Sequence, residues 1–186
     1  MPVSRAADKL AAAATAFDYD FRGKTVLDIG SSTGGFTEYA LSHGAAKVFA
    51  VEKGTKQMKA PLRFDTRIDL REKTDIFTVW QPSVDPIDLI LADVSFVSLQ
   101  KVLLHTKKQF SEYNPDFLVM LKPQFEAKAH QLNHGIVKNE KIRREIIKNF
   151  EIWLKNHQFK IINKRDNQLA GKNGNLERFY WLKLAK

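Results

Sequence analysis

Short apolar runs recur along the first two thirds of the chain, and each is bounded by Gly, Pro, Asn or Asp. They cover residues 25–29, 47–52, 76–80, 88–94 and 117–121. Their length and continuity predict buried β-strands. Between most of them apolar residues recur at helical spacing, as over 36–43 and 98–110. Alternating strands and helices predict a parallel sheet covered on both faces.

The last third of the chain follows a different pattern. Residues 139–156 predict a basic helix, and strand-like stretches follow at 159–165 and 177–184. The connection over 166–175 is too short for a crossover helix, so these two strands are expected to form an antiparallel hairpin. We therefore expect an α/β, Rossmann-like fold: a mostly parallel seven-stranded sheet with an antiparallel last strand and helices on both faces.

The predicted basic helix has two sides. Its apolar stripe is expected to contact the core, and its polar side is interpreted as a solvated face that could also track phosphates. The stripe is Ile142, Ile146, Phe150, Trp153 and Leu154, and the polar side is Lys141, Arg143, Arg144, Lys148 and Lys155. At the other end of the chain, alanine-rich residues 6–16 predict a helix packed on the sheet domain. We expect residues 1–20 to form an N-terminal helical segment and residues 21–186 the main domain.

A glycine-rich turn follows the first predicted strand, in the segment from Thr25 to Phe36. Glycines at 30, 34 and 35 let the backbone turn tightly and approach a ligand closely. A dinucleotide fingerprint needs glycine where Ser32 stands, and a phosphate-binding loop needs lysine where Phe36 stands. The sequence of the turn instead fits the Asp-x-Gly-x-x-x-Gly loop of S-adenosylmethionine-dependent methyltransferases, whose ligand has no phosphate. A plain strand-to-helix turn is the alternative.

An acidic residue ends the next strand about 20 residues later, where dinucleotide folds place a ribose-binding acid. This residue, Glu52, is expected to accept hydrogen bonds from the ribose hydroxyls of an adenosine-bearing ligand. The whole expected donor-binding set is Asp28, Gly30, Ser31, Ser32, Thr33, Gly34, Gly35, Phe36, Glu52, Asp75 and Asp93.

Two charged residues end later apolar runs: Asp93 ends the run 88–93, and Lys122 ends the run 117–122 before Pro123. In an open α/β sheet these carboxyl ends share one edge with Asp28. An acid and a lysine beside a methyl donor suit removal of a proton from an attacking hydroxyl, with a neutral Lys122 as the base. A structural ion pair with Asp93 is the alternative. The turn after Asp93 lacks the Pro-Pro-aromatic sequence of enzymes that methylate base amines, which favours a ribose hydroxyl as target.

The chain of 186 residues has a formal net charge of +9, which favours a polyanionic partner such as nucleic acid. A generally basic surface is the alternative. With no cysteine, the chain has neither a disulfide nor a Cys-based metal site, and it lacks the thiolate that methylation at C5 of a pyrimidine requires. We expect no metal. A membrane span needs about 18 consecutive apolar residues, and no run in this chain is nearly that long. We therefore expect a cytoplasmic protein without membrane contact.

Together these motifs resemble the TlyA family of FtsJ-like ribosomal RNA 2′-O-methyltransferases, often labelled hemolysin A. The resemblance covers nearly the whole chain and implies a class I methyltransferase fold, S-adenosylmethionine as donor, and ribosomal RNA or ribosomal subunits as partner. It also implies a catalytic tetrad of Lys9, Asp93, Lys122 and Glu177, with Lys122 as proton acceptor. The matching segments are Ser4 to Leu10, Asp28 to Phe36, Ala92 to Leu99, Leu121 to Glu126, Gly135 to Val137 and Gly174 to Glu177.

Two departures from the family pattern stand out. Family members carry an N-terminal RNA-binding domain of the S4 type, and this sequence starts just after the place where that domain would end. The family's Ser-Pro before the last loop glycine is replaced here by residues 167–170. We expect a truncated or unusually short member, and a monomer. The alternatives are a non-catalytic RNA-binding module, a membrane-lytic protein and, more distantly, a dinucleotide-dependent oxidoreductase. Phe36, Phe96 and Phe125 could each stack on a base or on adenine, or pack in the core.

Overall fold

The computed structural model describes residues 4–78, 86–167 and 174–185. Within these residues seven strands form one sheet in the order β3-β2-β1-β4-β5-β7-β6. All neighbours from β3 to β5 are parallel, and β7 runs antiparallel to both β5 and β6. The predicted sheet with its antiparallel last strand is thus confirmed. The strands are β1 (Thr25–Ile29), β2 (Lys47–Val51), β3 (Ile68–Arg71), β4 (Leu89–Ala92), β5 (Asp116–Leu121), β6 (Phe159–Asp166) and β7 (Arg178–Leu184).

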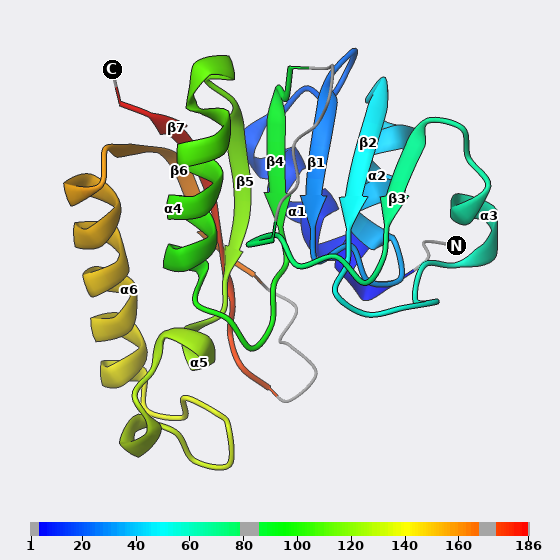
Figure 1. The fold of residues 1–186 in the computed structure, drawn as a ribbon. Coiled ribbons are helices and arrows are strands. Elements are labelled where there is room, and N and C mark those ends of the chain that lie inside the picture. The colour runs from blue at the N-terminus through cyan, green and yellow to red at the C-terminus, as the bar shows by residue number, and fades with distance from the viewer. Residues whose placement is uncertain (1–3, 79–85, 168–173, 186) are drawn as a thin grey trace.

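Helices cover both faces of this sheet. In Figure 1, α4 and α6 lie on the near face, and α1 and α2 lie behind it. Each layer has its own apolar cluster: Phe110 and Phe150 belong to the near one, and Leu10 and Leu41 to the far one. The helices are α1 (Arg5–Phe17), α2 (Gly35–Ser42), α3 (Ala60–Arg63), α4 (Leu99–Phe110), α5 (Pro123–Glu126) and α6 (Glu140–Asn156), with short 3-10 turns η1 (Ser111–Tyr113) and η2 (Ala129–Gln131).

The central strands read as continuous apolar runs because both of their faces are buried. In β1, Val26 points into the cluster beneath α1 and α2, whereas its neighbour Leu27 points into the cluster beneath α4. Leu89 and Ile90 of β4 divide in the same way. Successive side chains of a strand point to opposite faces, so a doubly covered strand has few positions for a polar residue away from its ends. Polar residues therefore mark the strand ends.

One predicted strand is wrong. The structure forms its third strand at Ile68–Arg71, whereas residues 76–78 form a turn and the rest of the predicted 76–80 run lies outside the described residues. The apolar run correctly indicated burial at Ile76, which lies in the core, but Phe77 is 41% exposed. The amide of Phe77 donates to the Asp75 carboxylate at 3.1 Å, which closes the turn. β3 is an edge strand that alternates apolar and charged residues, so no apolar run announced it.

The basic helix and the terminal hairpin occur as predicted. Asn139 caps α6, and its side chain accepts from the amide of Lys141 at 2.9 Å. Within the stripe, Ile146, Phe150 and Leu154 are buried. The interpretation of the other side needs one correction, because Arg143 is only 6% exposed and lies under the hairpin rather than on a solvated face.

Candidate functional site

A cavity of about 370 Å³ lies at the carboxyl ends of the parallel strands. This is the lower edge of the sheet in Figure 1, where the arrowheads of β1, β2 and β4 end. It is bounded by the turn between β1 and α2, the ends of β4 and β5, the start of α1 and the start of β7. Its lining residues are Ser4, Arg5, Ala6, Lys9, Gly30, Ser31, Ser32, Thr33, Gly35, Phe36, Asp93, Ser95, Lys122 and Glu177.

The glycine turn is shaped by backbone contacts. Gly30 has a φ of +79°, and its amide donates to the carbonyl of Val51 at 2.9 Å. A Cβ on Gly30 would lie 2.9 Å from the carbonyl oxygen of Asp93. A Cβ on Gly35 would meet Ser4 Oγ and lie 3.0 Å from the backbone nitrogen of Ala7. Glycine is therefore required where the turn touches β4 and α1.

Asp28 stands beneath this turn and is completely buried. Its Oδ2 accepts a hydrogen bond from Thr37 Oγ1, at the start of α2, at 2.6 Å. Burial is the main reason that the pKa of this carboxyl is raised to about 7, and the nearby charge of Asp93 acts in the same direction, while the Thr37 hydroxyl opposes both. Asp28 thus ties the end of β1 to α2 from below and is not among the residues that line the cavity.

Glu52 also supports the turn in this structure. Its Oε2 accepts from the amide of Ser32 at 2.9 Å, and its Oε1 accepts from the amide of Gly54 at 2.6 Å. Ser32 has a φ of +47°, so the residue that replaces a fingerprint glycine still adopts the left-handed conformation. Asp75 receives hydrogen bonds from the amide of Phe77 and from Lys53 Nζ, each at 3.1 Å. Neither acid lines the cavity, so ribose binding by Glu52 and donor binding by Asp75 stay predictions.

Lys122 and Asp93 meet across the ends of β5 and β4. Lys122 Nζ lies 2.7 Å from Asp93 Oδ1, an ion pair whose angles fall outside those of a hydrogen bond, and it donates to Ser95 Oγ at 2.8 Å. The Lys122 side chain is 12% exposed. Lys122 is extended and precedes Pro123, the first residue of α5, so β5 cannot continue and its last side chain turns toward the cavity.

Lys9 and Glu177 form the second ion pair, in which Lys9 Nζ and Glu177 Oε2 lie 2.5 Å apart. Lys9 comes from α1 and Glu177 directly precedes β7, so this pair joins two segments 168 residues apart in sequence. Both side chains are nearly buried, at 12% and 4% exposure. A buried pair of this kind is retained only where its geometry is favourable, because the desolvation of two charges is costly.

The cavity therefore brings together all four residues of the predicted tetrad. Of the predicted donor-binding residues it also contains Gly30, Ser31, Ser32, Thr33, Gly35 and Phe36, but not Asp28, Gly34, Glu52 or Asp75. Gly34 packs away from the cavity, where a Cβ would meet Leu62 at 2.5 Å. The sequence reasoning named no role for Ser95 or for Ser4, Arg5 and Ala6. Ser95 follows Asp93 by two residues, and this nearness in sequence could have identified it as a residue of the site.

The three candidate stacking aromatics occupy different environments. Phe36 is 2% exposed and packs against Phe179, with ring centroids 6.0 Å apart, so it belongs to the core although its edge lines the cavity. Phe96 is 93% exposed and has a φ of +62°, and its ring lies 5.2 Å from that of Phe125. A large apolar side chain that stays exposed one residue beyond Ser95 is available to an incoming base.

The residues present fit S-adenosylmethionine. Two buried hydroxyls that line the cavity, Ser4 Oγ and Ser31 Oγ, have no hydrogen-bond partner among the residues that the structure describes. Buried polar groups normally find partners, so these two are suited to the polar amino-acid end of the donor. Phe36 in place of a phosphate-binding lysine fits a ligand without phosphates. In the part of the chain that the structure describes, there is no cluster of potential metal ligands and no helix that could span a membrane.

Comparisons with known proteins agree with this geometry. The family model described as FtsJ-like methyltransferase matches residues 2–184. A Brachyspira hyodysenteriae protein named Hemolysin A is 36% identical over 184 residues, which cover 94% of this chain and 74% of the relative. A Mycobacterium tuberculosis protein named 16S/23S rRNA (cytidine-2'-O)-methyltransferase TlyA is 34% identical over 183 residues, which cover 97% of this chain and 68% of the relative.

Solved structures give the same result. The structure of a presumed hemolysin from Lactococcus lactis superimposes with a TM-score of 0.90 at 32% identity and covers 97% of this chain and 88% of that one. A presumed S-adenosylmethionine-dependent methyltransferase from Listeria monocytogenes gives a TM-score of 0.66 at 15% identity, covering 98% of this chain and 99% of that one, which supports the fold alone.

Proposed function

Because this chain belongs to the FtsJ-like methyltransferase family, we propose that it transfers a methyl group from S-adenosylmethionine to a ribose 2′-hydroxyl of ribosomal RNA. The observation that carries the proposal is the meeting of Lys9, Asp93, Lys122 and Glu177 in one cavity beside the glycine turn. Two relatives named as ribosomal RNA (cytidine-2'-O)-methyltransferases, from Mycobacterium tuberculosis and Campylobacter jejuni, support the choice of substrate. The net charge of +9 suits a polyanionic partner.

Each tetrad residue has a role in the proposed reaction. When bound, S-adenosylmethionine supplies a methyl group on a positively charged sulfur. In the proposed step Lys122 would act as the neutral amine and accept the proton that the 2′-hydroxyl loses as its oxygen bonds to that methyl group. The bond between the methyl group and sulfur would break at the same time, and its electron pair would stay on the sulfur, which would leave uncharged. Asp93 and Ser95, at 2.7 and 2.8 Å, hold that amine in place. Lys9 and Glu177 form the opposite wall and orient the hydroxyl.

The glycine turn would hold the donor. Gly30 and Gly35 let the backbone approach the ligand, and the unpartnered Ser31 hydroxyl offers a polar contact. Asp28 and Glu52 support the turn from outside the cavity through Thr37 and Ser32. In this arrangement the donor contacts come from the β1–α2 side and the acceptor contacts from the β4–β5–β7 side.

The deciding experiment is methyl transfer from labelled S-adenosylmethionine to ribosomal subunits and to extracted ribosomal RNA, followed by mapping of 2′-O-methyl positions. We expect label in RNA at a 2′-oxygen. Label on a base would contradict the 2′-hydroxyl as target but would still agree with methyltransferase activity. Donor binding by calorimetry without any transfer would instead favour a non-catalytic RNA-binding module.

A further inference from the structure

Glu177 lies at a junction that several other side chains fix from outside the cavity. It is 3% exposed, it sits between Leu176 and the first residue of β7, and its carbonyl accepts from the amide of Asn167 at 2.9 Å. We propose that Arg143 of α6 is a positioning residue that sets the direction of the Glu177 carboxylate toward Lys9. This inference rests on the proposed function, in which Glu177 belongs to the catalytic wall.

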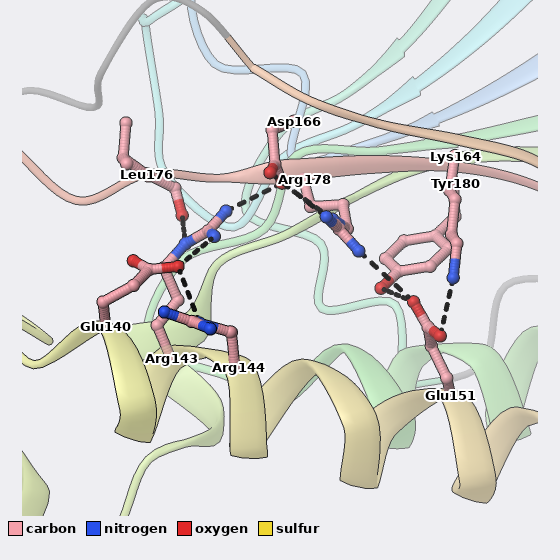
Figure 2. A network of polar contacts seen from close by, with 9 residues as sticks. All are labelled: Glu140, Arg143, Arg144, Glu151, Lys164, Asp166, Leu176, Arg178 and Tyr180. Atoms are coloured by element: carbon pink, nitrogen blue, oxygen red, sulfur yellow. Dashed lines mark hydrogen bonds and ion pairs between the residues drawn. The ribbon is translucent and has the colours of Figure 1, made fainter.

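The contact that carries the proposal is a hydrogen bond to the backbone beside Glu177. Arg143 Nε donates to the carbonyl of Leu176 at 3.3 Å. That carbonyl belongs to the peptide unit that joins Leu176 to Glu177, and a peptide unit is planar. Holding its oxygen therefore restricts the peptide plane that ends at the Cα of Glu177, and with it the positions open to the Glu177 side chain. Figure 2 shows Arg143 reaching up from α6 to this carbonyl.

The same guanidinium also holds the residue on the other side of Glu177, through a shared carboxylate. Arg143 Nη2 lies 2.7 Å from Asp166 Oδ1, and Arg178 contacts the same carboxylate through Nε at 2.7 Å and Nη2 at 3.1 Å. Asp166 and Arg178 are register partners in the β6–β7 pair. Leu176 is thus tied directly to Arg143, and Arg178 is tied to it through Asp166 (Figure 2). These two residues precede and follow Glu177 in the sequence.

This assembly is anchored to α6 a second time. Glu151, two turns further along the helix, binds Arg178 Nη1 at 3.4 Å, the Tyr180 hydroxyl at 3.0 Å and Lys164 Nζ at 2.7 Å. Because the helix is rigid between Arg143 and Glu151, the start of β7 is held at two points. Any movement of the start of β7 would displace Glu177, so the contacts at Arg143 and Glu151 restrict the position of Glu177.

The geometry requires arginine rather than any cation. Only a guanidinium offers an Nε donor to a carbonyl and an Nη donor to a carboxylate from one planar group, and the lysine ammonium is a point charge on a flexible stem. Arg143 is 6% exposed. The Arg178 guanidinium first, and Arg143 in addition, keep the pKa of Asp166 below its usual range, so the shared carboxylate is charged.

The neighbouring residue supplies a matched control. Arg144 carries the same charge on the same turn and also approaches Glu140, at 3.6 Å, but its side chain is 73% exposed, and Arg143 is the one that contacts Leu176 and Asp166. Both substitutions remove one cation and one contact with Glu140, but only Arg143→Met also removes the contacts with the Leu176 carbonyl and with Asp166. Asp166 keeps Arg178 in both variants, so neither change leaves an unpaired buried charge.

We expect Arg143→Met to lower kcat about 10–100-fold with little change in the KM for the donor, since a displacement of about 1 Å in a catalytic group costs up to about 100-fold. Arg144→Met should retain wild-type kcat, and Arg143→Lys should not rescue it. In a Glu177→Gln background, adding Arg143→Met should lower the rate little further, because the two changes act through one group. Additive losses would overturn the proposal.

A second readout does not depend on activity. The carboxyl ¹³C signal of Glu177 should move in folded Arg143→Met and Arg143→Lys and stay in place in Arg144→Met. An unchanged Glu177 signal in either folded Arg143 variant would overturn the positioning role. If Arg143→Met fails to fold, Arg143→Lys decides alone. A wild-type protein without methyl transfer would contradict the proposed function, and the carboxyl signal would still test the positioning.

Discussion

The two sides of the cavity are built by different means. On the donor side, around β1, α2 and β2, the chain is shaped by backbone contacts: glycines, amide-to-carbonyl bonds, and acids such as Glu52 that bind amides. On the acceptor side, around β4, β5 and β7, charged side chains pair with one another, as Lys122 does with Asp93 and Lys9 with Glu177. One side holds its shape through main chain, and the other through ion pairs.

This difference corresponds to the chemistry of each side. Binding a constant small molecule requires a fixed surface, which a glycine turn provides without any side chain to misplace. Moving a proton requires groups that can change charge and be re-aimed, which side chains provide. The two sides touch at Gly30, whose missing Cβ leaves room for the carbonyl of Asp93. A substitution on one side of the cavity should therefore leave the other side largely intact, except at Gly30.

The largest effect is expected at Lys122. Lys122→Ala should lower kcat by roughly 10²–10⁴-fold, because the proposed proton acceptor is lost, while donor affinity stays within a few-fold. Labelled methyl transfer measures the first quantity and calorimetry the second. Lys101→Ala, on the exposed side of α4, is the control and should behave as wild type. Complete loss of donor binding would show that Lys122 is structural.

Gly30 tests the point where the two sides touch. Gly30→Ala introduces a Cβ 2.9 Å from the Asp93 carbonyl, at a φ of +79°. The turn or the end of β4 must shift, so donor affinity should fall by about tenfold or more, equal to about 1.4 kcal/mol.

The control for this change is Gly23→Ala. Gly23 has a φ of +70° but nothing within 4 Å of its Cβ position. Like Gly30→Ala, Gly23→Ala places a Cβ on a left-handed backbone, which should lower the free energy of unfolding by about 1–2 kcal/mol. Its donor affinity should not change. Equal donor affinities in the two variants would mean that contact with Asp93 is irrelevant to the turn.

A third prediction extends the acceptor side beyond the cavity. Phe96→Ala should raise the KM for RNA by about 5- to 150-fold, as expected for the loss of about 1–3 kcal/mol of stacking on a base, with no change in donor affinity. Phe64, which is 82% exposed at the end of α3, is a matched exposed phenylalanine. Phe64→Ala should leave the KM unchanged, and an equal rise in both variants would indicate a non-specific apolar effect.

The smallest effect concerns the pH dependence of stability on the donor side. The pKa of Asp28 is about 7 in the folded chain against 3.8 without burial, so the folded state binds more protons between these values. Its contribution to stability is complete below the lower value and is lost as pH rises through the higher one.

Replacing Asp28 by Asn removes this titration. Between pH 4 and pH 7 the melting temperature of the wild type should decline more than that of Asp28→Asn, by a few degrees. Asp18→Asn, at the exposed end of α1, should keep the wild-type slope. Parallel curves for Asp28→Asn and the wild type would show that the buried carboxyl does not titrate in this range.

The sequence was most informative where burial leaves little choice. β4 and β5 are covered on both faces, so each is an apolar run that is followed by a charged residue, and those ends identified Asp93 and Lys122. The terminal hairpin followed from the shortness of its connection. β3 escaped detection because an edge strand tolerates charged residues at alternate positions, and Ile76 was mistaken for part of a strand because a buried turn residue is also apolar.

Tertiary contacts account for what the pattern did not reveal. Arg143 lies on the polar side of its helix and is buried only because the β6–β7 hairpin folds over it, which no helical period can indicate. Lys9 lies in an ordinary alanine-rich helix, and only the resemblance to a known family singled it out. The carboxylates of Glu52 and Asp75 turned toward nearby amides, a local choice that depends on turn geometry rather than on residue type.

The pairing of Lys9 with Glu177 has a consequence for biosynthesis. Its two members are 168 residues apart, so during translation Lys9 leaves the ribosome 168 residues before its partner does. Long-range contacts of this kind form late because the loop between them must close first. The cavity therefore gains its last wall only after Glu177 has been synthesised, and a chain interrupted before that residue lacks the Lys9–Glu177 pair.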